Sequence, residues 1–71
     1  MSNKNRNSLA FNEFQSVYTA LMLDTCVDRE YSVDRLRFLF SSGAGEKENM
    51  DALLASGKIT AEEYGSIIAE S

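Results

Sequence analysis

The sequence contains no histidine, no proline and no tryptophan, and it has a single cysteine. Without histidine, serine–histidine and cysteine–histidine nucleophile pairs are excluded, and the usual general base near neutral pH is missing. One cysteine cannot close a disulfide within the chain, and one cysteine without histidine argues against a structural zinc site. We therefore expect a protein that is not an enzyme and that binds no cofactor and no metal.

Long apolar runs are missing as well. No run approaches the roughly 18 residues of a membrane span, and the N-terminus lacks the apolar core of a signal peptide. The 71 residues, of which 44% are hydrophobic, fit one small globular domain. Because so small a domain buries a limited share of its surface, it needs further support, and association is the support left. We expect a cytoplasmic protein that makes no contact with a membrane.

The charge is distributed unevenly. Seven Lys and Arg stand against eleven Asp and Glu, which gives a net charge of -4. Residues 1–40 hold five basic and five acidic groups, so the whole net charge lies in residues 41–71. Because an acidic surface repels phosphate, we do not expect direct binding to nucleic acid. The acidic part either steers the chain toward a basic site on another protein or is a solvated helix face.

The first half of the chain predicts two helices. Apolar residues from Ser8 onward recur with helical period, which predicts a helix over about 8–24 after a flexible tail of residues 1–7. Ser32 is the expected cap of a second helix over about 32–42, with Tyr31 and Leu36 as a hydrophobic staple. The residues expected in the core are Phe11, Phe14, Val17, Tyr18, Leu21, Met22, Leu36, Leu39 and Phe40.

Phe38 points away from the core-facing side of the second predicted helix, next to Arg35. Two interpretations stay open. An exposed phenylalanine is a candidate contact residue for a partner, whereas a small bundle could also cover both faces of the helix.

The last third predicts a helical hairpin. The third helix is expected over about 46–56, and Gly57 suits the position just after its end. Thr60 and Glu63 form a capping box that opens a fourth helix over about 60–70. The apolar residues of the two helices are Met50, Leu53, Leu54, Tyr64, Ile67 and Ile68. The fold class is therefore all-α: a compact bundle of four short helices, in one domain over residues 8–71, that ends in a tight αα-hairpin.

Several motifs fail on inspection. A calcium loop that starts at Asp24 would place arginines where it needs glycine and glutamate. The hairpin invites a helix-turn-helix interpretation, but Glu62 and Glu63 would repel DNA at the start of the recognition helix. Cys26 lies between two aspartates, which would raise its pKa, so a buried and unreactive side chain is expected.

Residues 50–68 carry a recognisable pattern. The run from Leu53 to Tyr64 has an apolar pair, a small-residue turn with Gly57, then Ile-Thr, two acids and an aromatic. This pattern resembles the XkdX-type small proteins of phages and prophages, and also the SHOCT-type helical hairpin of bacterial proteins. Residues 1–45 match neither family. The resemblance implies a bacterial or phage origin and a non-enzymatic role in protein binding, with no catalytic residues to carry over.

We therefore expect a small acidic protein that binds another protein, such as a phage or prophage accessory protein or an inhibitor of a host defence protein, an anti-CRISPR included. The partner would be another protein, for example a basic one that handles nucleic acid, or a second copy in a homodimer. The alternatives are a homo-oligomeric structural or virion component and a small DNA-binding transcriptional regulator. The candidate partner-binding residues are Phe38, Arg35, Glu62, Glu63 and Glu70.

Overall fold

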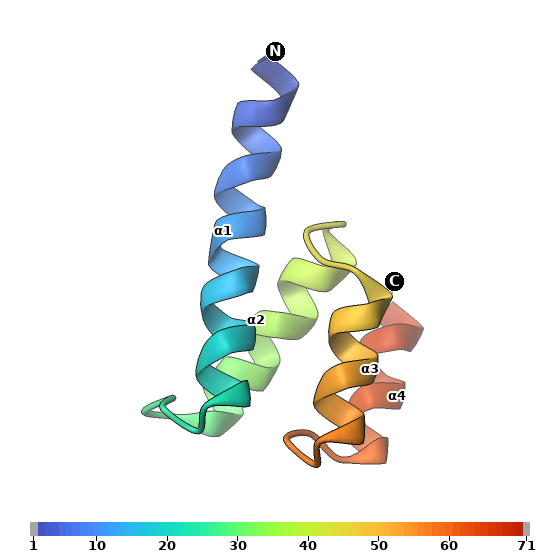
Figure 1. Cartoon of the computed structure of the whole chain (residues 1–71). Coiled ribbons are helices and arrows are strands. Elements are labelled where there is room, and N and C mark those ends of the chain that lie inside the picture. The colour runs from blue at the N-terminus through green and yellow to red at the C-terminus, as the bar shows by residue number, and fades with distance from the viewer. Residues whose placement is uncertain (1, 71) are drawn as a thin grey trace.

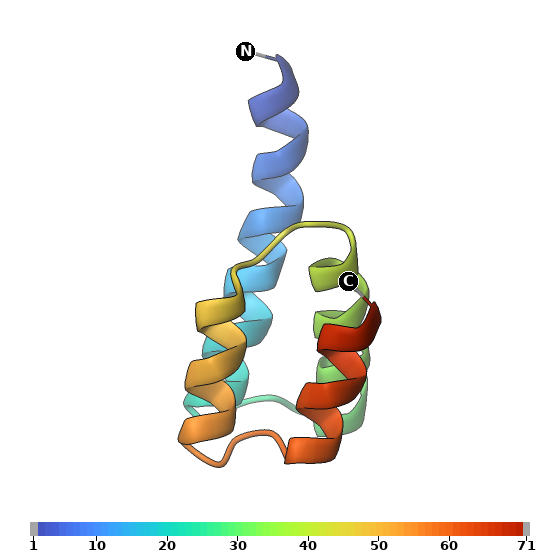
Figure 2. The ribbon, with the colours of Figure 1, turned by 90° about the vertical axis from the view of Figure 1, so that its right-hand side faces the viewer.

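The computed structural model describes the backbone of residues 2–70 and the side chains of residues 9–69. Over that range it contains four helices and no strand: α1 (Ser2–Met22), α2 (Arg29–Ser41), α3 (Lys47–Ala55) and α4 (Ala61–Glu70). Successive helices alternate in direction (Figures 1 and 2). The predicted all-α bundle of four short helices is confirmed.

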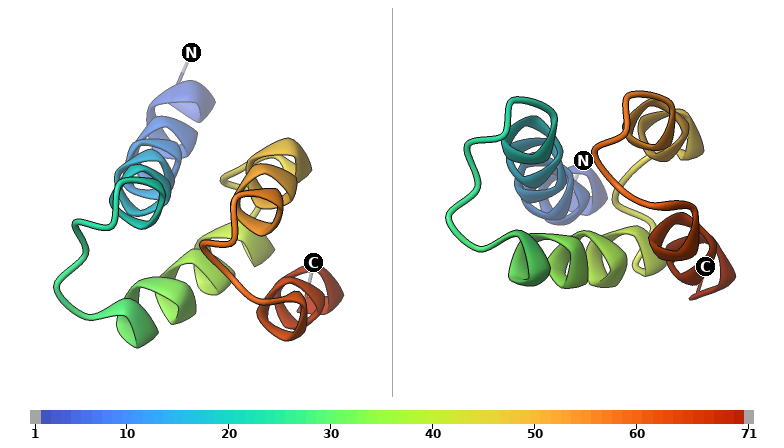
Figure 3. Two further views of the ribbon diagram at one scale, coloured as in Figure 1. Left: turned by 60° about the horizontal axis from the view of Figure 1, so that its bottom comes forward. Right: turned by 90° about the horizontal axis from the view of Figure 1, so that it is seen from below.

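The helices are arranged as a ring. α1 packs against α2 and α3, and α4 packs against the same two helices. Seen from below, the four helices lie at the corners of a quadrilateral, with α2 running obliquely (Figure 3). α1 is the longest, and its N-terminal turns extend beyond the other three helices (Figure 2).

The core lies inside this ring and draws on every helix. Phe14, Leu36, Met50, Leu53 and Ile67 are fully buried, and no polar side chain among those described is buried. The ring of Phe14 stacks on Tyr18 with 6.5 Å between centroids and meets Phe40 at 6.4 Å. Each large side chain removed from water contributes about 1.5–3 kcal/mol. The apolar stripes predicted for the four helices therefore converge on one core.

Three helices end in the same hydrogen-bonded turn. After α3, the amide of Gly57 donates to Leu54 O at 3.0 Å and the amide of Lys58 donates to Leu53 O at 2.9 Å. This is the Schellman pattern, which needs a left-handed residue after the helix. Gly57 has φ 77°, and Gly43 takes the same place after α2 with φ 87°. After α1 the left-handed residue is Asp24, with φ 59°.

The connection over residues 42–46 is packed against the core. Ala44 is buried, and the backbone of Gly45 lies directly on the ring of Phe14. A Cβ atom added to Gly45 would stand 2.3 Å from Cζ of Phe14. Glycine is therefore required at this position for close approach.

Several helix boundaries differ from the predictions. α2 begins at Arg29, because Asp28 is its N-cap and accepts a hydrogen bond from the amide of Tyr31 at 3.1 Å. The expected cap, Ser32, lies inside the helix, and the expected staple is wrong because Tyr31 is 62% exposed. Aspartate and serine are equally good N-cap residues, and the one that comes first in the chain, Asp28, caps α2.

The boundaries of α1 also differ. This helix spans Ser2–Met22 rather than about 8–24, since no proline or glycine in residues 2–7 interrupts it and Asp24 ends it. The flexibility of residues 1–7 stays a prediction. Phe11, expected in the core, is 43% exposed, because it lies at the margin of the apolar arc of α1.

Candidate protein-binding surfaces

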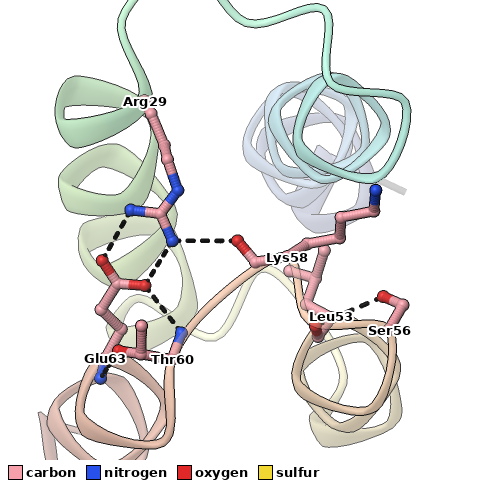
Figure 4. Close-up of polar contacts among 6 residues, drawn as sticks. All are labelled: Arg29, Leu53, Ser56, Lys58, Thr60 and Glu63. Atoms are coloured by element: carbon pink, nitrogen blue, oxygen red, sulfur yellow. Dashed lines mark hydrogen bonds and ion pairs between the residues drawn. The ribbon is translucent and has the colours of Figure 1, made fainter.

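An ion pair joins the first turn of α2 to the first turn of α4 (Figure 4). Nη1 of Arg29 donates to Oε2 of Glu63 at 2.8 Å, and Nη2 donates to Oε1 at 2.6 Å. Nη2 also donates to the carbonyl oxygen of Lys58 at 2.9 Å. This one guanidinium therefore ties α2 both to α4 and to the connection that precedes it.

The same carboxylate completes the predicted capping box. Oε1 of Glu63 accepts the amide of Thr60 at 2.9 Å, and Oγ1 of Thr60 accepts the amide of Glu63 at 3.0 Å. The hydrogen bonds from Arg29, together with the bond from Thr60, lower the pKa of Glu63 from 4.5 to about 2. The same pairing raises the pKa of Arg29. Glu63 is thus engaged within the chain.

Beside this pair lies a groove between α2 and α4, with a volume of about 320 Å³. We refer to it as the α2–α4 groove. Val33 and Ile67 are buried and form its floor. Its walls are polar and consist of Glu30, Asp34 and Arg37 from α2 and Glu62, Glu63 and Ser66 from α4.

Two of the four carboxylates in the groove are paired. Glu63 is held by Arg29, and Asp34 accepts a hydrogen bond from Nη2 of Arg37 at 2.8 Å. Glu30 and Glu62 are exposed and form no ion pair with any side chain that the structure describes. These two carboxylates make the groove negative. Both lie in the first turn of a helix, where a negative charge also stabilises the helix dipole.

A second surface is formed where α1 packs on α2. The guanidinium of Arg35 donates two hydrogen bonds to the carboxylate of Glu13, the one from Nη2 at 2.9 Å. This pairing lowers the pKa of Glu13 and raises the pKa of Arg35. The guanidinium also lies 5.0 Å from the ring centroid of Phe38, at the distance of a cation–π contact. Phe38 is 57% exposed, so the bundle does not cover this face of α2, and the contact of Phe38 with a partner stays a prediction.

The predicted partner-binding residues do not form one site. Phe38 and Arg35 lie on the surface shared by α1 and α2, whereas Glu62 and Glu63 lie in the α2–α4 groove. The side chain of Glu70 falls outside the described side chains. The prediction missed Glu30, Asp34 and Arg37 of the opposite wall. Their i, i+4, i+7 spacing places them on one face of a helix, and this was the available signal.

The remaining chemistry is sparse. Across the described residues, no helix is long and apolar enough to cross a membrane. Nor do three metal-ligating side chains cluster anywhere in that part of the chain. Cys26 is half-buried and has a free thiol.

No family model, no curated protein and no solved structure matches the chain. The resemblance of residues 50–68 to the XkdX-type and SHOCT-type proteins stays a prediction.

Proposed function

We propose that this protein is a non-enzymatic binding protein whose α2–α4 groove receives a basic segment of a larger protein. The observation that carries the proposal is the combination of an apolar floor with unpaired carboxylates on both walls. The stem of a lysine or arginine can lie on Val33 and Ile67 while its cationic head reaches Glu30 or Glu62. Electrostatic attraction would steer such a segment to the groove.

The test is a titration of the isotope-labelled protein with a short amphipathic peptide of lysine and leucine, followed by amide chemical shifts. We expect shift changes confined to α2 and α4, with an affinity that falls as salt is added. Glu62→Lys should weaken binding at least about fivefold, since the charge at this position changes by two units, from attractive to repulsive toward the basic ligand. Glu48→Lys is the matched control, because Glu48 is also exposed but lies on α3 outside the groove. Equal losses in both variants would show only general attraction to an acidic protein and would refute the groove.

Within this class we propose a phage or prophage inhibitor of a host defence protein, with an anti-CRISPR as the specific form. Small size and a negative groove support it, because such a groove can occupy a basic surface that otherwise holds nucleic acid. The measurement is the plating efficiency of a targeted phage on a host with active CRISPR immunity, with and without this protein. Rescue by the wild type but not by Glu30→Lys/Glu62→Lys is expected. If neither the wild type nor the double variant rescues the phage, the anti-CRISPR proposal is wrong. The titration would still test whether the groove binds a basic segment.

A further inference from the structure

Exposed apolar side chains gather in one half of this molecule. The six large exposed hydrophobic residues all fall between positions 9 and 38, and none of the described side chains after Phe38 joins them. The net charge of -4 belongs to residues 41–71, which include α3 and α4. The chain therefore presents a charge-balanced, partly apolar half and an acidic half.

Three of these side chains surround the ion pair between α1 and α2. On α2, Tyr31, Arg35 and Phe38 have i, i+4, i+7 spacing and share one face of the helix. On α1, Leu9 precedes Glu13 by about one turn and is 74% exposed. We call this set the α1–α2 face: Leu9, Glu13, Tyr31, Arg35 and Phe38.

The exposed side chains of the face each lie about one helical turn from a member of the ion pair. α1 and α2 run in opposite directions, and α2 also slants away from α1 toward α4 (Figures 1 and 3). Along α2, Phe38 contacts Arg35 from the C-terminal side, and Tyr31 lies about one turn away on the N-terminal side.

We propose that the α1–α2 face is the interface of a homodimer, with a second copy of this chain as its occupant. The face carries one positive and one negative charge side by side. A twofold axis that lies in the interface, perpendicular to the line from Glu13 to Arg35, sets Glu13 of each copy against Arg35 of the other. The surface at a twofold interface must be complementary to itself. The paired charges of Glu13 and Arg35 meet this requirement.

The residue types and their geometry suit such an interface. Tyrosine, arginine and phenylalanine are enriched where protein interfaces are buried. Arg35 is already held by Glu13 and stacked on Phe38, so little side-chain freedom is lost on association. The α2–α4 groove lies on another side of α2 and remains open in the dimer. This proposal therefore stands independently of the proposed function.

The first measurement is sedimentation velocity of the wild type from about 1 μM to about 1 mM, a range that covers ordinary dimer affinities. We expect the mass to rise from monomer to dimer. Phe38→Ser should weaken association at least about tenfold, and circular dichroism would verify that the variant remains folded. A wild type that stays monomeric across the range would overturn the proposal.

A charge-reversal experiment identifies the face. Glu13→Arg gives the face two positive charges, and Arg35→Glu gives it two negative charges. Each variant alone should stay monomeric, and an equal mixture should form a heterodimer whose mass native mass spectrometry can assign. Glu62→Lys, a charge reversal in the groove, should dimerise like the wild type. If the wild type dimerises but the mixture does not, the interface lies elsewhere and the proposal is wrong.

Discussion

Replacement of Glu63 by glutamine separates the two tasks of this side chain. Glutamine can still accept the amide of Thr60, because capping boxes use either residue at this position. It cannot carry the negative charge that pairs with Arg29. We therefore expect Glu63→Gln to keep the start of α4 and to loosen the contact between α2 and α4.

The magnitude follows from the geometry. Arg29 donates to Glu63 at 2.6 and 2.8 Å, and the pKa of Glu63 falls from 4.5 to about 2. Such a shift corresponds to at most about 3 kcal/mol of differential stabilisation. The side chain of Arg29 is 44% exposed, so solvent screening reduces this value. We expect the variant to lose about 1–2 kcal/mol of unfolding free energy at pH 7.

The pH dependence has a defined sign. The pKa of Glu63 is lower in the folded chain than in the unfolded one, so the pair stabilises the fold fully above about pH 5. Its contribution declines as the pH falls toward about 2, where the folded carboxyl also takes up a proton. The difference between wild type and Glu63→Gln should therefore stay constant from pH 7 to about pH 5 and narrow as the pH falls from there toward about 2.

Urea unfolding followed by far-ultraviolet circular dichroism measures these differences. Glu62→Gln is the matched control, since Glu62 is exposed and forms no ion pair with a described side chain, and it should change stability by less than about 0.5 kcal/mol. A double-mutant cycle with Arg29→Gln should give a coupling energy of about 1 kcal/mol or more at pH 7. No coupling, or a difference that is unchanged at low pH, would refute the assignment of Glu63 to Arg29.

Two further predictions concern backbone positions, and thermal melts test both. Gly45→Ala should lose about 1–3 kcal/mol, because the new Cβ meets the ring of Phe14, whereas Gly65→Ala in open space within α4 should gain about 0.5–1 kcal/mol. If Gly45→Ala leaves the melting temperature unchanged, the close approach of Gly45 to the ring of Phe14 is contradicted. Asp24→Gly should be more stable than Asp24→Ala by about 1 kcal/mol, because both lose the ion pair with Lys58 and only glycine suits the positive φ. Equal melting temperatures would contradict the left-handed turn.

Local patterns account for most of the fold. The capping box of Thr60 and Glu63 and the left-handed Gly57 depend on neighbours within a few residues, so the sequence alone predicts them. The start of α2 was missed because Asp28 and Ser32 are both good N-caps one turn apart. The burial of Ala44 was missed because it follows from the turn after α2 rather than from a helical stripe.

The candidate surfaces were harder to predict, because they join residues far apart in the sequence. The sequence predicts the capping role of Glu63, but only the fold brings Arg29 to it from 34 residues away. Glu13 and Arg35 are separated by 22 residues and meet for the same reason. Periodicity places Phe38 on the outer side of α2 but cannot show that Arg35 beside it is paired with Glu13.

The ring of helices also bears on how fast the chain folds. α1 meets α2 through the short connection 23–28, and α3 meets α4 through the connection 56–60. Each of these two hairpins closes a small loop, so its entropic barrier is low and it can form early. The seam between α2 and α4 joins the hairpins, and its ion pair, Arg29 with Glu63, forms only once they dock. Loss of this ion pair should therefore accelerate unfolding while the refolding rate stays nearly unchanged.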